Sequence, residues 1–228
     1  MKVKKFTEKS VVEDYIVEKL QERGWKYVNA ENLGRESFEE PLLINNLIDA
    51  LKRINRSKGL GGEEIKNVLN ELKLRTAGSE DAKKILNFYK FGVLIKFEKE
   101  KVLKHVQLFD FDELENNEFI VSRQVSYDGK ERIRTDIILY VNGIPLVSIE
   151  CKNPTSIGQS WYNAYKQIKD YEETVPELYK YVQIGVAAER VAKYFPIVPW
   201  QKEGVKIHQW KSGKKDSIDA TVEMLSPE

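Results

Sequence analysis

Cysteine, histidine and net charge are all scarce in this chain, and each scarcity excludes a class of protein. The 228 residues include one Cys, which excludes an internal disulfide framework and suits a reducing cytoplasm. The two histidines, His105 and His208, lie far apart without neighbouring cysteines, which argues against a zinc site or a histidine-based triad. The formal net charge is only +1, so any affinity for nucleic acid must come from a local basic surface.

Long apolar runs and targeting signals are missing as well. No apolar run reaches 18 residues, and the lysine-rich start of the chain is followed by charged residues rather than by an apolar signal core. We therefore expect a soluble cytoplasmic protein that is not exported and has no membrane partner. The Gly-rich segment 59–66 lacks the Gly-Lys-Ser/Thr of a phosphate-binding loop, so we interpret it as a linker.

The most informative stretch is residues 132–154, which predicts a β-hairpin. Two β-prone runs, 137–141 and 144–149, flank the dipeptide Asn142-Gly143. This dipeptide tolerates the positive φ angles of a tight two-residue turn. The local fold of this stretch is therefore predicted with little ambiguity.

Charged residues interrupt the apolar pattern at corresponding ends of the two strands. Asp136 enters the first strand, and Glu150 and Lys152 leave the second. Because side chains alternate along a strand, Glu150 and Lys152 share one face and Cys151 points to the other, where we expect a small buried residue. Whether Asp136 joins Glu150 and Lys152 depends on the register of the hairpin.

A regular register would separate the charges. A strict two-residue loop pairs residue 136 with residue 149, which turns Asp136 to the wrong face, whereas an offset of one residue brings it to the face of Glu150. A bulge introduces such an offset, and Pro145, which has no N–H for the ladder, lies where a bulge is tolerated. We therefore predict an irregular hairpin.

The chemistry of such a cluster suits phosphodiester hydrolysis. Two carboxylates and a main-chain carbonyl are hard oxygen ligands that hold Mg²⁺ and leave positions for water and a phosphate oxygen. The metal lowers the pKa of bound water, and an adjacent Lys stabilises the charge that develops on the phosphate. For an arbitrary match to this spacing, however, a surface salt bridge is the commoner explanation.

The surrounding residues resemble the PD-(D/E)-x-K nuclease motif in the form found at the N-terminus of the R subunit of type I restriction-modification enzymes. The family pattern consists of R-x-D, a hydrophobic strand, N-G-x-P-L, a second hydrophobic run and E-x-K-N-P. The matching residues of this chain are Arg134, Asp136, Asn142, Gly143, Pro145, Leu146, Glu150, Lys152, Asn153 and Pro154. The chain departs from the motif at Thr135, where the motif's name has proline.

The resemblance implies a role for each charged residue. Asp136 and Glu150 would be ligands of Mg²⁺, the main-chain carbonyl of Cys151 a third ligand, and Lys152 the catalytic lysine. It also implies the fold, an α/β restriction-endonuclease-like mixed central sheet flanked by helices, with a helical insert before the sheet.

The first helix is expected over residues 8–23, with an amphipathic pattern that ends at Gly24. In the R-subunit family a glutamate of this helix reaches the metal centre. Glu13 sits at the matching distance in the sequence, and Glu8 and Glu18 are alternatives. An exposed helical glutamate without a role fits Glu13 equally well.

Supporting and DNA-contacting residues are expected on two other segments. A helix over 158–174 places Gln167 and Tyr171 four apart on one side, and the family has a Q-x-x-x-Y element here that supports the centre and contacts DNA. A core Tyr and a solvent-exposed Gln is the alternative explanation. The best candidates for a DNA-backbone patch are basic residues near Asp136, although charges beside a loop are often only solvated: Arg123, Lys130, Arg132 and Arg134.

Periodicity predicts the remaining elements. The expected helices are 36–54, 63–74 and 79–90, and the expected strands are 92–97, 102–111, 119–127, 181–188 and 205–210. We expect the first three strands to lie alongside the central hairpin. The predicted organisation is one nuclease domain over 1–212, with an insert at 36–91 and a catalytic core at 92–210, followed by a tail or linker at 213–228.

The resemblance also implies what the complete enzyme needs. R subunits are much longer and carry two motor domains, whereas no helicase motif occurs here, so we expect an N-terminal fragment or, as the alternative, a stand-alone relative. ATP and S-adenosylmethionine would be used only by other domains and subunits. The implied partners are double-stranded DNA, the motor domains, and the methyltransferase and specificity subunits.

Three functions follow from these observations. The first is a Mg²⁺-dependent endonuclease domain that cuts double-stranded DNA without reading its sequence. The second is a stand-alone structure-specific or repair nuclease, similar to Holliday-junction resolvases and RecB-like enzymes. The third is a non-catalytic module that binds DNA or docks other subunits.

Overall fold

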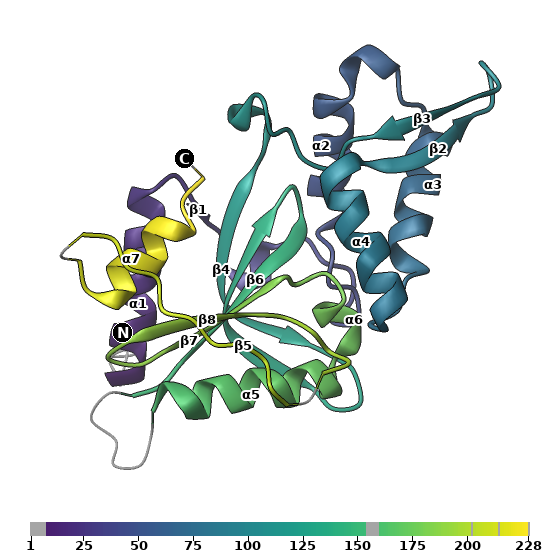
Figure 1. The fold of residues 1–228 in the computed structure, drawn as a ribbon. Helices are drawn as coiled ribbons and strands as arrows, with labels where there is room; N and C mark the ends of the chain where they lie inside the picture. Colours follow the sequence, from purple (N-terminus) through teal and green to yellow (C-terminus); the bar gives the residue numbers. More distant parts are fainter. Residues whose placement is uncertain (1–7, 154–159, 202, 214, 228) are drawn as a thin grey trace.

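The computed structural model describes residues 8–153, 160–201, 203–213 and 215–227, and it has a mixed α/β fold (Figure 1). A six-stranded sheet with the order β1-β4-β5-β6-β7-β8 forms its centre. The strands are β1 (Lys26–Tyr27), β4 (Phe119–Tyr127), β5 (Ile133–Val141), β6 (Ile144–Cys151), β7 (Ile184–Ala188) and β8 (Ala192–Pro196). β1 runs parallel to β4 and β6 parallel to β7, while the other pairs are antiparallel. The predicted mixed sheet flanked by helices is therefore confirmed.

None of the helices within the described ranges has the length and apolar composition needed to cross a membrane.

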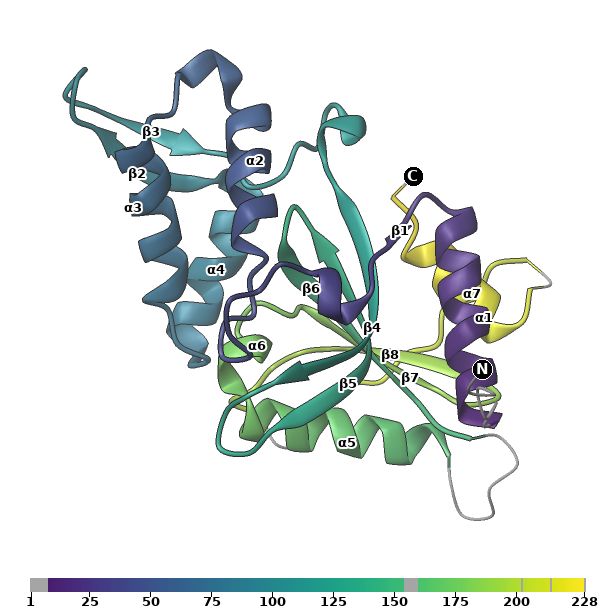
Figure 2. The same ribbon diagram turned by 180° about the vertical axis from the view of Figure 1, so that it is seen from behind.

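Helices cover both faces of the sheet (Figures 1 and 2). α5 (Trp161–Thr174) lies along one face, and α1 (Glu8–Glu22) lies beside α7 (Ser217–Met224) on the other. Alternate residues of β5 supply both cores, because Ile138 packs in the cluster with α5 and Leu139 in the cluster with α1. The apolar run of this hairpin is thus explained by burial on two faces.

The turn between β5 and β6 has the conformation that its dipeptide predicts. Asn142 has φ +53° and Gly143 has φ +80°, so both residues are left-handed, as in a type I′ turn. A Cβ at Gly143 would lie 2.5 Å from the main-chain oxygen of Leu43, so the close approach of this segment also requires glycine.

The insert forms a lobe beside the sheet (Figure 1). Its elements are α2 (Ile44–Ile54), α3 (Gly62–Lys73), α4 (Ser79–Phe91), β2 (Val93–Phe97) and β3 (Val102–Val106), and they share one hydrophobic cluster. The helices predicted at 63–74 and 79–90 are confirmed as α3 and α4. The helix predicted over 36–54 is wrong in its first part, because α2 begins only at Ile44.

Proline and a tertiary hydrogen bond explain the late start of α2. Pro41 has no N–H and disfavours helical geometry in the residue before it. Leu43, which is buried, donates its N–H to the carbonyl oxygen of Gly143 at 2.8 Å. This segment therefore holds the turn between β5 and β6 instead of starting a helix.

The first two predicted strands exist but do not join the central sheet, which corrects the expected arrangement. Among the described strands, β2 and β3 pair only with each other, in a regular antiparallel register. β2 alternates buried and exposed residues, so it buries a single face, and that face packs on the helices of the insert. Alternation predicts a half-buried strand but does not say which partner covers it.

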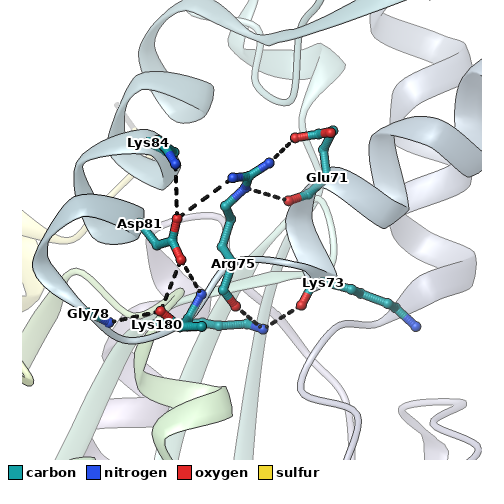
Figure 3. Close-up of polar contacts among 8 residues, drawn as sticks. Glu71, Lys73, Arg75, Gly78, Asp81, Lys84 and Lys180 are labelled. Atoms are coloured by element: carbon teal, nitrogen blue, oxygen red, sulfur yellow. Dashed lines mark hydrogen bonds and ion pairs between the residues drawn. The ribbon is translucent and has the colours of Figure 1, made fainter.

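A buried lysine connects the insert to the central domain through hydrogen bonds (Figure 3). α6 (Pro176–Tyr179) is followed by Lys180, which is only 3% exposed. Its Nζ donates to the main-chain oxygens of Lys73 at 3.0 Å and Arg75 at 2.8 Å, just after α3, and to Glu177 at 2.5 Å. Lys180 thus satisfies carbonyls that a helix end leaves without partners.

The C-terminal part differs from the expected elements in two places. Residues 205–210 do not form a strand and contribute a single bridge, between His208 and Tyr194 of β8, an edge strand that the sequence did not reveal. Residues 217–224 of the expected tail form the helix α7. That helix packs because Tyr15 donates to Asp219 at 2.6 Å and buried apolar residues face α1.

Candidate active site at the open end of the β5–β6 hairpin

The hairpin contains the predicted irregularity. Val141 pairs with Ile144, but Leu139 pairs with Val147, so Leu146 is an extra residue that shifts the register by one. Beyond the bulge residue 137 pairs with 149, and one step further the same register sets residue 136 opposite 150. Without the bulge these two carboxylates would point to opposite faces.

Asp136 is buried and held by both of its oxygens. It is 2% exposed, its Oδ1 accepts from Gln124 Nε2 at 3.2 Å, and its Oδ2 accepts from the Cys151 N–H at 2.8 Å. Glu150 is 1% exposed. Two carboxylates without exposure to water are costly unless cations or hydrogen bonds compensate them, so this is not an ordinary surface salt bridge.

Lys152 completes the cluster through a chain of side chains from α5. Its Nζ lies 3.3 Å from Glu150 Oε1 and also donates to Gln167 Oε1. The Gln167 amide in turn donates to the hydroxyl of Tyr171, which donates to the carbonyl oxygen of Arg134 at 3.2 Å. The structure thus brings Gln167 and Tyr171 together with Lys152, one helical turn apart on the inner side of α5.

Glu13 is the glutamate of the first helix that faces this site. It is 3% exposed, and its Oε2 accepts from Gln124 Nε2 at 2.8 Å and from Arg123 Nη2 at 3.1 Å. Burial, together with the negative charge of Asp136, raises the pKa of the Glu13 carboxyl. Glu18 is exposed, and the side chain of Glu8 lies outside the described residues.

The four basic residues near Asp136 have different surroundings. Arg123 donates to Glu13 and Asp14, so its charge is directed into the site. Arg132 forms a two-pronged pair with Asp128 at 2.6 and 2.8 Å. Lys130 and Arg134 are exposed.

The donor atoms at the site have the chemistry that a hard cation requires. Within the part of the chain that the structure describes, no three His, Cys, Asp or Glu side chains form a ready metal cluster. The hard oxygen donors that the sequence predicted for this position are the carboxylates of Asp136 and Glu150 and the main-chain carbonyl of Cys151. The thiol of Cys151 is excluded, because this side chain is fully buried in the core on the α1 side. Oxygen donors of this kind fit Mg²⁺, which keeps several waters.

A hollow of about 700 Å³ opens beside Lys152 along α5. Its lining includes Tyr162, Lys166 and Lys169 as well as Lys152 and Gln167. α5 begins here, with Ser160 accepting from the N–H of Tyr162 at 3.2 Å. Pro154, the last residue of the predicted motif, lies outside the described residues.

Comparison with known protein families shows which family this chain belongs to. Residues 5–204 match the sequence model of the type I restriction enzyme R protein N terminus. The chain belongs to that family.

Relatives of this R-protein domain carry names of the same kind. A Methanocaldococcus jannaschii protein named as the type I restriction enzyme MjaVIIIP endonuclease subunit is 30% identical over 90% of this chain and 20% of its own length. The type I restriction enzyme HindI endonuclease subunit of Haemophilus influenzae is 26% identical over 83% of this chain and 20% of its own length. The chain spans about a fifth of the length of the curated relatives it matches.

One residue at the centre of this R-protein site had no signal in the sequence. Gln124 bridges Glu13 and Asp136, yet nothing in the spacing of β4 distinguishes it from a solvent-facing strand residue. Its side chain reaches the site because its φ is +53°, and periodicity does not reveal a left-handed residue inside a strand. Asp14, which pairs with Arg123, was likewise missed.

Proposed function

We propose that this R-protein domain is a Mg²⁺-dependent endonuclease that hydrolyses phosphodiester bonds of double-stranded DNA without reading their sequence. The observation that carries the proposal is the bulge at Leu146, which sets Asp136 opposite Glu150 beside Lys152. The bulge interrupts the hydrogen-bond ladder of a buried hairpin. Its consequence is that Asp136 and Glu150 lie on the same face of the sheet.

Each of the three charged residues has a distinct role in this proposal. Asp136 and Glu150 would hold the cation, together with the Cys151 carbonyl. A cation held there would supply a bound water of lowered pKa and positive charge against the phosphate. Lys152 would direct its amine at the attacked phosphate or the attacking water, and the hydrogen bond that it donates to Gln167 fixes the direction of that amine.

Glu13 has a secondary role. Its carboxyl is buried close to Asp136, where it accepts hydrogen bonds from Arg123 and from Gln124, which also bonds Asp136. We propose that Glu13 would help to hold the cation, either directly or through a bridging water. The pairing of Arg123 with Glu13 supports a role for Arg123 inside the centre rather than on the DNA backbone.

The DNA backbone is proposed to lie along the hollow beside Lys152. Lys166 lines it from α5, and phosphate contacts from Lys position DNA without reading bases. Lys169 also lines it, but it is paired with Glu172 and would have to exchange partners to reach a phosphate. Arg134 lies at the start of β5 and Lys130 in the loop before it, and we propose that these two exposed residues also contact the DNA backbone. Arg132, which is paired with Asp128, would have to exchange partners to reach a phosphate.

The rest of the enzyme is proposed from family membership. We infer that target choice lies in a specificity subunit with its methyltransferase, and that ATP and S-adenosylmethionine are used only outside this domain. We further propose that residues 1–212 form one nuclease domain with its insert. Because α7 packs on α1, this domain would also include α7.

Plasmid cleavage by the assembled enzyme in Mg²⁺ tests the proposal. Glu150→Gln keeps the shape of the buried side chain and removes its charge, so cutting should be lost while ATP hydrolysis by the motor continues. The matched control is Glu98→Gln, which alters an exposed strand-end glutamate of the insert and should leave cutting unchanged. Normal cutting by Glu150→Gln would eliminate the proposed centre, and cutting confined to branched DNA would favour a repair nuclease.

A further inference from the structure

Gln124, near the middle of β4, has a backbone conformation that strand residues rarely adopt. Its φ of +53° lies in the left-handed region, where the Cβ of a non-glycine residue crowds the backbone. The residues on both sides of it stay paired with β5, so Gln124 lies opposite Asp136. Strained residues of this kind persist only where their surroundings hold them, and they gather at functional sites.

The conformation changes which face of the sheet the side chains reach. Consecutive residues of a regular strand point to opposite faces, yet Arg123 Nη2 and Gln124 Nε2 both donate to Glu13 Oε2, at 3.1 and 2.8 Å. The alternation also changes phase here, because Val121 packs in the cluster with α1 whereas Val125 packs in the cluster with α5. The left-handed residue therefore aims the Gln124 carboxamide at the carboxylates.

The carboxamide connects two acidic groups from different elements. An amide nitrogen carries two N–H donors, and here they serve Glu13 of α1 and Asp136 of β5, the latter at 3.2 Å. The amide is uncharged, so it bridges the two carboxylates without competing with a cation. A Lys at this position would neutralise them, and a Glu would add repulsion.

We propose that Gln124 is a positioning residue of the metal centre, whose carboxamide holds Glu13 and Asp136 at the spacing in which Asp136 shares a divalent cation with Glu150. This inference rests on the proposed function. Without the bridge the two like charges separate, and the Asp136 carboxylate keeps the hydrogen bond from the Cys151 N–H to Oδ2 but loses the one from Gln124 to Oδ1. The cation then binds more weakly, while the chemistry at saturating cation changes less.

Three variants separate the side chain from the backbone. Gln124→Gly accepts the positive φ without strain and removes the carboxamide. Gln124→Asn keeps an amide and tolerates the left-handed region, but its side chain is one methylene too short to reach both carboxylates. Lys101→Gly is the matched control, because Lys101 also has φ +53° but lies in the turn between β2 and β3.

The measurement is calorimetric titration of the full chain with Mn²⁺ alone, without nucleotide, using Glu150→Gln as the blank. We expect Gln124→Gly and Gln124→Asn to weaken Mn²⁺ binding by about 10- to 100-fold, the range typical of groups that orient metal ligands. In plasmid cleavage by the assembled enzyme, the half-saturating Mg²⁺ concentration should rise by a similar factor, with a smaller fall in the rate at saturating Mg²⁺. Lys101→Gly should behave as the unaltered protein in both assays.

The outcomes distinguish this inference from the proposed function. If the unaltered protein binds Mn²⁺, Glu150→Gln does not, and both Gln124 variants bind as tightly as the unaltered protein, only the inference about Gln124 is overturned. If Glu150→Gln binds and cuts normally, the nuclease centre itself is overturned and Gln124 with it. Thermal unfolding of each variant checks that a variant with weakened Mn²⁺ binding is still folded. If Gln124→Gly does not fold, the Mn²⁺ affinity of Gln124→Asn decides the test.

Discussion

Two hairpins of this domain carry the same pair of charges, and only one of them buries it. In β6 and the residue after it, Glu150 and Lys152 lie two apart, with side chains 2% and 12% exposed. In β2 and the residue after it, Lys96 and Glu98 lie two apart at 2.9 Å, and both side chains are more than half exposed. Exposed pairs contribute little to stability, whereas a buried pair must be supported by further contacts.

The surrounding contacts distinguish the buried pair from the exposed one. Lys152 is held by Gln167 of α5, and a bulge sets Asp136 opposite Glu150. The β2–β3 hairpin has no bulge, and its register is regular from end to end. A lysine and a glutamate at strand spacing therefore indicate chemistry only where the fold removes them from water and surrounds them with partners.

The largest expected difference between the hairpins is in activity. Lys152→Met keeps the length of the side chain and removes its amine, so cleavage by the assembled enzyme should fall by about 10²- to 10³-fold, as for loss of one transition-state donor. Lys96→Met makes the same change in the exposed pair and should cut at the rate of the unaltered enzyme. Equal rates for the two variants would contradict the distinction.

The turns should differ in tolerance to a single methyl group. Gly143→Ala introduces a side chain at φ +80°, and its Cβ would lie 2.5 Å from the Leu43 oxygen. We expect a loss of about 2–4 kcal/mol in the free energy of unfolding, from backbone strain and overpacking together. Urea denaturation measures it, and a change of less than about 1 kcal/mol would mean that this close approach relaxes freely.

The covering helices also differ in their buried carboxyls, which predicts a pH dependence. In α3, beside β2, Glu64 caps its own helix by accepting from the Gly61 N–H at 3.0 Å. In α5, beside β6, Glu172 Oε2 accepts from Lys169, but Oε1 has no hydrogen-bond partner among the described residues. Burial raises the pKa of Glu172 to about 7.

The sign of that effect follows from proton linkage. Between the ordinary pKa of 4.5 and about 7 the unfolded chain loses a proton that the folded chain keeps, so stability falls as pH rises through this window. Glu172→Gln should therefore raise the free energy of unfolding at pH 8 by on the order of 2 kcal/mol, with little gain at pH 4. Denaturant titrations at the two pH values check this, and equal gains at both would contradict it.

The smallest effect is expected at the turn of the β2–β3 hairpin. Lys101 has φ +53° and is exposed, so Lys101→Gly removes backbone strain without removing a buried contact. We expect a gain of at most about 1 kcal/mol in the free energy of unfolding, which is about 2–4 °C in Tm. A loss of similar size would show that this turn is as demanding as the one at Gly143.

Local chemistry was enough to predict the β5–β6 hairpin and its irregularity. The dipeptide Asn142-Gly143 specifies the turn because few other residues accept two positive φ angles. The need to bring Asp136 to the face of Glu150 predicted the bulge, since side chains alternate with a period of two. These inferences depend on near neighbours, which the sequence displays directly.

Predictions that depended on distant partners were weaker. Residues 36–43 have a helical pattern but hold the β5–β6 turn, and residues 217–224 looked like a tail but cover one face of the sheet next to α1. β2 and β3 were recognised as strands and assigned to the wrong sheet. Periodicity reports which face of an element is apolar, and it carries no information about what packs on that face.

The sequence alone determined the turn that pairs the two strands. It also determined the identity and order of the charged residues on them, Asp136, Glu150 and Lys152. Only the tertiary structure decided that Glu13 meets them, that α5 supports the lysine, and that Gln124 bridges the carboxylates. The reason is physical: turns and alternation are set by each residue's own backbone, whereas a bridge between helix and strand exists only after the sheet has brought them together.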